Sequence, residues 1–191
     1  MKEIIPNVSL MPGTKGSWTI KQMVKEESFM DTIELMKTGR YVPPGKYTML
    51  YRDRTLVMSD TPDEKRDHMD FVRKAQGNIL IAGLGLGMVL QACLLKPEVT
   101  QVTVIEISQD LIDLVKPHYD RMFPCGKFAV ICADIFDWKP PKNERYNCAW
   151  FDIWDDLCPD SLSEMAKLHR KFGKRVDWQG SWGKEFISRR R

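Results

Sequence analysis

Long apolar runs are missing from this sequence. No stretch approaches the roughly 20 apolar residues that a membrane-spanning helix needs. The first residues, Met1 to Pro6, also lack the apolar core of a signal peptide. These absences argue against helical membrane proteins, and they predict a cytoplasmic protein without a membrane partner.

Paired cysteines and clustered histidines are missing too. The five cysteines are an odd number, none has C-x-x-C spacing, and the three histidines are scattered. We therefore expect reduced, mostly buried thiols instead of a disulfide framework, and no metal site. These residues are Cys93, Cys125, Cys132, Cys148, Cys158, His68, His118 and His169.

The composition is that of a globular chain with an uneven charge distribution. Of 191 residues, 43% are hydrophobic and 29% charged, which predicts one domain with a real core and at most a small appendage. The net charge is only +3, but residues 161–191 hold nine Lys or Arg against three acids. Such a tail could contact nucleic acid, although a basic run is more often a solvated face.

Three glycines mark the centre of the chain. Residues 78–90 read N-I-L-I-A-G-L-G-L-G-M-V-L, with Gly83, Gly85 and Gly87 at alternate positions after a short apolar run. This pattern predicts a buried strand, a tight turn and a helix. Glycines there let a ligand approach the backbone, as in nucleotide sites, although such a turn can also serve packing alone.

Strands and helices alternate after this turn. The pattern predicts strands at 101–107, 128–132 and 147–153, and helices at 88–95, 109–120 and 161–172, with Ser108 capping the second helix. Such alternation is typical of an α/β, Rossmann-like, doubly wound, mostly parallel sheet. Beyond Phe172 there is room for one strand, around 174–178, so we expect a sheet abbreviated at its C-terminal end.

The N-terminal part has a different pattern. We expect a loop at 11–17, a strand at 18–24, a short helix at 27–37 and a β-hairpin formed by 47–51 and 55–58. A helix over 63–75 follows, with Thr61 as its cap and Met69, Val72 and Phe71 facing inward. The chain would then divide into a β-rich extension (1–60) and a Rossmann-like domain with a basic tail (61–191).

Four acids fall where strands of this sheet should end. Ligands of doubly wound sheets bind at the carboxyl ends of strands. Glu106 could accept both hydroxyls of a ribose, and Asp134 suits the amine of adenine. Asp152 and Asp155, beside Trp150, could hold an amine or take its proton. Alternatively, Glu106 is a solvated strand end and Asp155 an N-terminal acid of the next helix.

These residues together resemble a known family. Gly83-Leu84-Gly85-Leu86-Gly87, together with Glu106, Asp134 and Asp152, looks like the pattern of class I methyltransferases, which use S-adenosylmethionine (SAM). Residues 47–172 most resemble the spermidine synthase group within that superfamily. Asp63, Glu64 and His68 match its segment before the sheet, and Asp152-Ile153-Trp154-Asp155 resembles its strand-four motif.

Departures from that group concern the polyamine half of its site. Met58 stands where the group has a cofactor-binding Gln, Asp67 where it has a substrate-binding Tyr, and Leu86 where its glycine loop has an Asp. The resemblance therefore implies the scaffold and the adenosine half of the site, with a different acceptor chemistry.

The resulting hypothesis is methyl transfer from SAM to an unidentified, most plausibly small-molecule, acceptor. The alternative functions are aminopropyl transfer, a non-catalytic SAM-binding module and nucleic-acid modification through the basic tail. A homodimer is a possible oligomeric state. Asp152 and Asp155 are the predicted catalytic residues. The predicted cofactor-binding residues are His68, Gly83, Gly85, Gly87, Glu106, Ile107, Asp134, Ile135 and Asp152.

Overall fold

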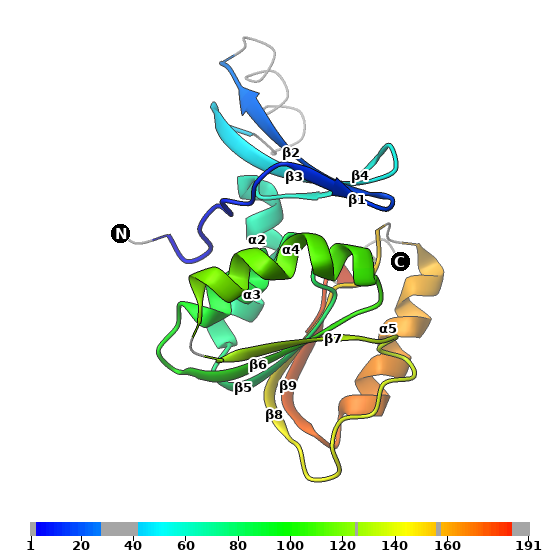
Figure 1. The fold of residues 1–191 in the computed structure, drawn as a ribbon. Coiled ribbons are helices and arrows are strands. Elements are labelled where there is room, and N and C mark those ends of the chain that lie inside the picture. Colours follow the sequence, from blue (N-terminus) through cyan, green and yellow to red (C-terminus); the bar gives the residue numbers. More distant parts are fainter. Residues whose placement is uncertain (1–2, 28–41, 125, 156–157, 185–191) are drawn as a thin grey trace.

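Two sheets of different type form the protein. The computed structural model describes residues 3–27, 42–124, 126–155 and 158–184. Within them, a four-stranded antiparallel sheet lies beside a five-stranded parallel sheet flanked by helices (Figure 1). The predicted helix at 27–37 and the arginines at the end of the basic tail lie outside the described residues, apart from Glu27.

The small sheet has the strand order β1-β2-β3-β4. Its strands are β1 (Gly13–Lys15), β2 (Trp18–Lys25), β3 (Gly45–Arg52) and β4 (Thr55–Ser59). The predicted hairpin is confirmed, because β3 and β4 pair antiparallel.

The loop predicted at 11–17 is wrong in its centre. Gly13–Lys15 is a strand, paired antiparallel with Trp18–Ile20 through a turn at Gly16, whose φ is 55°. Its three residues have no hydrophobic alternation, so the neighbouring strand, not its own pattern, makes it a strand.

The parallel sheet has the order β7-β6-β5-β8-β9. Its strands are β5 (Gly77–Ala82), β6 (Val99–Glu106), β7 (Phe128–Cys132), β8 (Tyr146–Phe151) and β9 (Val176–Ser181). All four neighbouring pairs are parallel. The chain winds outward from β5 in one direction to β7 and then in the other to β9, which confirms the doubly wound fold. Ligands of such folds bind where the strand order reverses, here at the carboxyl end of β5.

Helices cover both faces of the parallel sheet. They are α2 (Pro62–Lys74), α3 (Met88–Leu94), α4 (Gln109–Met122) and α5 (Pro159–Phe172). In Figure 1, α2, α3 and α4 lie on the side of the small sheet and α5 on the opposite side. The register of β5 explains this double cover: Ile79 and Ile81 join the core cluster on the α3 side, and Leu80 and Ala82 join the cluster on the α5 side.

One prediction about helix details is confirmed and two differ from the structure. The Ser108 side chain caps α4 as predicted, by accepting from Leu111 N at 3.3 Å. Thr61 stands at the N-cap of α2 but makes no capping bond, because its hydroxyl pairs with Ser59 Oγ at 2.9 Å. In α2, Phe71 and Val72 are fully buried as predicted, whereas Met69 is only half-buried and His68 lies inside instead.

The thiols divide between core and surface. Cys93 and Cys148 are buried, but Cys132 and Cys158 are exposed, so the prediction of mostly buried thiols holds for half of the described cysteines. Burial raises the pKa of the Cys93 thiol to about 12, which keeps it protonated and unreactive. Within the described ranges, no helix is long and apolar enough to cross a membrane.

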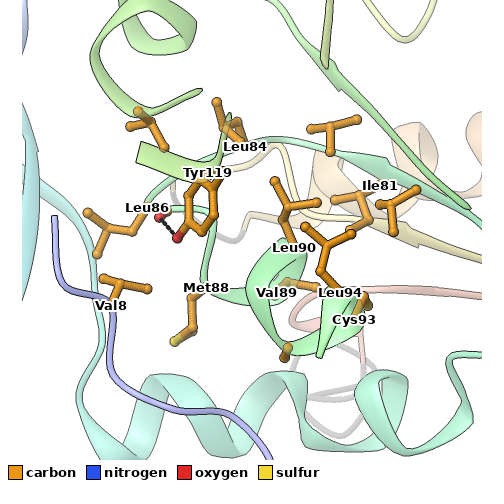
Figure 2. Packing of buried hydrophobic residues seen from close by; sticks show 14 of the residues in the cluster. Val8, Ile81, Leu84, Leu86, Met88, Val89, Leu90, Cys93, Leu94 and Tyr119 are labelled. Carbon is orange, nitrogen blue, oxygen red and sulfur yellow. Dashed lines mark hydrogen bonds between the residues drawn. The ribbon is translucent and has the colours of Figure 1, made fainter. Parts of the chain in front are cut away.

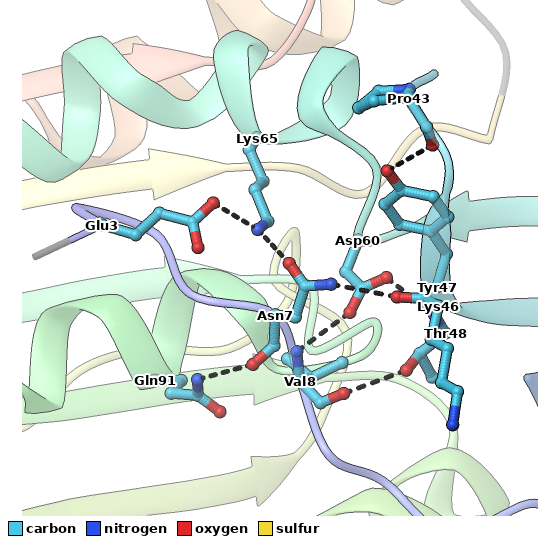
Figure 3. A network of polar contacts seen from close by, with 10 residues as sticks. All are labelled: Glu3, Asn7, Val8, Pro43, Lys46, Tyr47, Thr48, Asp60, Lys65 and Gln91. Carbon is cyan, nitrogen blue, oxygen red and sulfur yellow. Dashed lines mark hydrogen bonds and ion pairs between the residues drawn. The ribbon is translucent and has the colours of Figure 1, made fainter. Parts of the chain in front are cut away.

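A buried carboxylate joins the N-terminal segment to the small sheet. Asp60 is fully buried and accepts from Val8 N at 2.9 Å and from Thr48 N at 2.7 Å (Figure 3). Nearby, Lys65 of α2 pairs with Glu3 at 2.7 Å and also contacts Asn7. Burial raises the pKa of Asp60, while its backbone hydrogen bonds and Lys65 oppose the shift. The network holds the segment before β1 against α2 and thereby fixes the small sheet over the parallel sheet.

Candidate functional site

A cavity of about 250 Å³ opens at the carboxyl ends of the parallel strands. The connections after β5, β6, β7 and β8 and the small sheet line it together. Every residue of the predicted site except Gly87 is in this lining. The tertiary structure therefore brings together groups that lie up to 87 positions apart in sequence, from His68 to Asp155.

The three glycines of the loop after β5 have different neighbours. All have positive φ, 96°, 50° and 71° in chain order. A Cβ at Gly83 would lie 1.9 Å from the Asp152 carbonyl oxygen, and one at Gly85 would lie 2.2 Å from the Met58 sulfur. A Cβ at Gly87 would lie 2.2 Å from the Tyr119 ring. Gly83 and Gly85 line the cavity, while Gly87 faces the packed core between α3 and α4.

Leu86 also points away from the cavity. Its side chain is fully buried near Val8 and Tyr119 (Figure 2). The Tyr119 hydroxyl donates to the Leu86 carbonyl at 2.7 Å, and the Leu86 amide donates to the Met58 sulfur at 3.1 Å. The resemblance places Leu86 where the related group has a ligand-binding acid. In the structure Leu86 is absent from the cavity lining, and its backbone amide donates to Met58, which does line the cavity.

Glu106 is held in place by main-chain donors. Its two oxygens accept from Leu84 N at 2.9 Å and from Ser108 N at 2.8 Å, and the residue is 7% exposed. A carboxylate oxygen has two acceptor positions, so each retains one for a ligand hydroxyl. The alternative that Glu106 is a solvated strand end is therefore wrong. The arrangement suits a pair of vicinal hydroxyls.

The turn after β7 forms the next part of the wall. Asp134 accepts from Phe136 N at 2.8 Å, which fixes the carboxylate at the end of the strand. Ile135, the next residue, is buried, whereas Ile107, which also lines the cavity, is 69% exposed. An acceptor next to an exposed aliphatic side chain suits a flat ring that carries an amine.

A lysine from the opposite face of the sheet supports this turn. Lys171 of α5 donates to the carbonyls of Ile135 at 2.8 Å and Phe136 at 2.7 Å. Desolvation lowers the pKa of Lys171, and the nearby Asp137 and Asp134 partly offset the shift. Sequence pattern could not find this role, because Lys171 is an ordinary basic residue in the last turn of a helix.

Asp152 and His68 both line the cavity. Desolvation raises the pKa of Asp152 to about 7, with Glu64 and Asp67 adding to the shift. Desolvation lowers the pKa of His68 to about 4, so its ring is neutral at pH 7. His68 Nε2 lies 3.8 Å from Asp152 Oδ2, too far for a hydrogen bond, and its Nδ1 has no partner among the described residues. Near neutral pH, Asp152 can therefore either hold or release a proton.

The small sheet supplies the far side of the cavity. Asp155 pairs with Arg52 from the end of β3, and the Arg52 guanidinium lies 5.6 Å from the centre of the Trp18 ring. Trp18 Nε1 donates to Ser108 Oγ at 2.8 Å. Sequence reasoning missed the lining residues Trp18, Arg52 and Trp182, since none belongs to a local motif.

Stacked aromatic rings form the wall behind Asp152. Trp150 stacks on Phe71 at a centroid distance of 5.2 Å and meets His68 edge-on at 5.9 Å. A Cβ at Gly180 would lie 2.8 Å from both Trp150 and Trp178, so this glycine lets the two indoles fit around β9. Trp150 is 6% exposed and is among the residues that line the cavity, so it serves both core and wall. Among the described residues, no group of three or more potential ligands could hold a metal ion.

Comparison with known proteins gives a partial match. No family model matches the chain. A ribosomal RNA small subunit methyltransferase A, found in two strains of Campylobacter jejuni, is 33% identical over 75 residues, 39% of this chain and 27% of the relative. The chain thus spans about a quarter of the length of the curated relatives it matches.

Solved structures match more of the chain at lower identity. The CcbJ methyltransferase from Streptomyces caelestis is 19% identical, with a TM-score of 0.47 over 60% of this chain and 45% of that protein. An S-adenosylmethionine-dependent methyltransferase from Clostridium acetobutylicum is 13% identical, with a TM-score of 0.42 over 58% of this chain and 43% of that protein. Overlaps this small do not assign an activity, and the likeness to the spermidine synthase group stays a prediction.

Proposed function

We propose that this protein binds SAM in the cavity and transfers its methyl group to an acceptor. The observation that carries the proposal is the convergence of the glycine loop with Glu106, Asp134 and Asp152 on one cavity at the switch point of the sheet. Each of these carboxylates comes from a different strand end, so one extended ligand can contact all three.

The adenosine half of SAM fits the side of β6 and β7. The free acceptor positions of Glu106 would take the ribose hydroxyls, and Asp134 would take the adenine amine. Ile107 and Ile135 would contact the ring from either side. Lys171 would keep the turn that carries Asp134 in place.

The amino-acid half fits the glycine loop. Gly83 and Gly85 let the ligand approach the backbone, and displacing the Met58 sulfur would free the Leu86 amide for the carboxylate of SAM. His68 and Asp152 would flank this end of the ligand. Gly87 would contribute by shaping the loop through its contact with Tyr119.

The reaction requires positioning and one proton acceptor. A lone pair on the acceptor attacks the methyl carbon, the carbon–sulfur bond breaks, and the sulfur keeps that electron pair as S-adenosylhomocysteine leaves. An amine acceptor then carries a surplus proton, which Asp152 can take because its pKa is raised to about 7. Asp155 would orient the acceptor from the far side.

Calorimetry tests the cofactor. We expect micromolar binding of SAM and S-adenosylhomocysteine and none of NAD, with SAM affinity about 100-fold lower in Glu106→Gln. The control is Glu98→Gln, which changes an exposed acid that pairs with Lys96 at 3.5 Å. Micromolar NAD binding without SAM binding would overturn the proposal. If SAM binds but no acceptor is methylated in any assay, and Asp152→Ala changes no phenotype, a non-catalytic SAM-binding module is the better reading.

A nucleic-acid acceptor is a second candidate, favoured by the sequence likeness to a ribosomal RNA methyltransferase. The cavity itself favours a cationic small-molecule acceptor over a nucleic acid, because five acids line it. Transfer of labelled methyl groups from SAM to RNA or to small amines separates these acceptors. Formation of spermidine from decarboxylated SAM and putrescine would instead establish aminopropyl transfer.

A further inference from the structure

Arg52 lines the cavity together with Trp18 and Asp155. It is the only Lys or Arg among the described residues that line the cavity, and five acids line the same cavity. Its guanidinium pairs with Asp155, beyond the end of β8, and lies 5.6 Å from the centre of the Trp18 ring. The Trp18 indole in turn donates a hydrogen bond to the Ser108 hydroxyl, just beyond β6. Arg52 therefore contacts the connection after β8 directly, through Asp155, and the connection after β6 indirectly, through Trp18.

The partners of Arg52 form a recognisable cation site. A carboxylate combined with an indole face is a favourable surrounding for an ammonium or guanidinium group, since ion pairing and the cation–π interaction act together. The site is held by its surroundings: Lys15 pairs with Asp113 at 2.5 Å, and Gly16 packs against Asp110, which docks the β1–β2 hairpin on α4.

The pair between Arg52 and Asp155 is open to exchange. Their side chains are 49% and 30% exposed, and pairs this accessible are weak. A ligand cation of similar shape can compete for the same partners, and Trp18 keeps its hydrogen bond to Ser108 when Arg52 turns outward into solvent.

We propose that Arg52 is a built-in plug for a cation subsite formed by Trp18 and Asp155, and that a cationic group of the ligand displaces it on binding. The assignment of the ligand rests on the proposed function. That group is either the ammonium of the cofactor's amino-acid end or an amine of the acceptor. A purely structural role would instead make Arg52 a clamp between the two sheets, with no exchange.

Chemical rescue tests the subsite without any cofactor. Arg52→Ala empties the subsite, so ethylguanidinium at millimolar concentration is expected to raise its thermal midpoint and restore slow amide exchange at 45–59 and 152–155. The wild type, whose subsite is filled, and Arg52→Ala/Asp155→Asn, which lacks the carboxylate, should not respond. The matched control is Arg145→Ala, which removes an exposed arginine that pairs with Asp177 at 3.3 Å.

The outcome of this rescue decides the subsite. An equal response of the double variant, or no response beyond that of Arg145→Ala, overturns the proposal. Should Arg52→Ala fold poorly, Arg52→Gln keeps the length of the side chain without its charge, and the same comparison is made with it.

Binding kinetics then identify the source of the cation. If the cofactor's ammonium displaces Arg52, SAM and S-adenosylhomocysteine should associate at least about threefold faster with Arg52→Gln than with the wild type, whereas methylthioadenosine, which lacks the amino-acid end, should not. If the acceptor's amine does so, those rates stay equal, and 1,4-diaminobutane binds the S-adenosylhomocysteine complex of Arg52→Gln at least about threefold more tightly.

Failure of the plug and failure of the proposed function give different results. A wild type that binds SAM, with neither the rates nor the diamine affinity changed in Arg52→Gln, rules out displacement by the ligand. A wild type that does not bind SAM overturns the proposed function, while the ethylguanidinium rescue still decides whether the subsite exists.

Discussion

The two halves of the cavity are built in different ways. On the side of β6 and β7, backbone amides fix both acids. Glu106 accepts from an amide two residues later and from one just beyond the neighbouring strand β5, and Asp134 accepts from an amide two residues later. On the other side, Trp18, Arg52 and Asp155 are held by contacts between side chains from two different sheets. The first half is rigid because the parallel sheet fixes its main chain, while the second depends on how the small sheet docks.

The largest effect is expected at Glu106, where the rigid half meets the ligand. Glu106→Gln replaces an acceptor oxygen by an amino group that faces the amide of Leu84 or Ser108. We expect SAM affinity to fall about 100-fold and the free energy of unfolding to fall by about 1–3 kcal/mol. Titration calorimetry and urea unfolding measure the two effects. Unchanged SAM affinity in a stably folded variant would remove Glu106 from the binding site.

Gly87 tests whether the glycine loop serves packing or binding. Gly87→Ala places a methyl group 2.2 Å from the Tyr119 ring at a φ of 71°, so we expect a loss of about 3 kcal/mol in the free energy of unfolding. Gly126→Ala is the control, because its φ is 67° but no atom lies within 4 Å of the added Cβ. The control should lose only about 1 kcal/mol, which is the backbone cost alone. Equal losses in denaturant unfolding would contradict a packing role for Gly87.

Asp152 should make stability depend on pH. Its pKa is raised to about 7 by burial, so the folded state binds a proton that the unfolded state has released above pH 4. Relative to Asp152→Asn, the wild type should therefore lose stability as the pH rises from 4 to 8. The expected change is about 2 kcal/mol, roughly half of what such a shift implies, since the side chain is 23% exposed.

Unfolding at several pH values, with the exposed Asp70→Asn as control, measures this dependence. A difference between wild type and Asp152→Asn that is constant from pH 4 to 8 contradicts it. The comparison uses matched variants because His68, whose pKa is lowered to about 4, destabilises the protein in the opposite direction, as the pH falls below 6.5.

The smallest effect is expected at Lys171, behind the adenine side. Lys171→Met removes both hydrogen bonds to the turn that carries Asp134. We expect SAM and adenosine to bind about three- to fivefold more weakly, because the turn is less well fixed and not because a ligand contact is lost. The exposed Lys167→Met, on the same helix, is the control. Weakened binding in both variants would mean that general loss of charge on α5 is responsible.

Local patterns were sufficient to predict most of the parallel sheet. The strand at 128–132 has the predicted bounds, and Ser108 caps α4 as expected. These features depend on neighbours in sequence: alternation, apolar runs, glycines and caps. The prediction failed at Gly13–Lys15, where three residues become a strand only because β2 lies beside them.

The site was predictable to the extent that its residues end strands. Glu106, Asp134, Asp152 and Asp155 line one cavity, as parallel strands require. Leu86 and Gly87 show the limit of a linear motif, because Gly85 lines the cavity whereas the next two residues of the same loop do not. The sequence comparison places both near the ligand, whereas the Leu86 side chain and Gly87 lie toward the core around Tyr119.

The sequence by itself determined the doubly wound sheet, the strand-end acids and the glycine turn, because backbone geometry and hydrophobic burial act over a few residues. Only the tertiary structure decided that Arg52 and Trp18 enter the cavity, that Lys171 supports its wall and that Met58 covers the loop. Those roles depend on how two sheets and a helix dock, and docking is set by contacts between residues far apart in the chain.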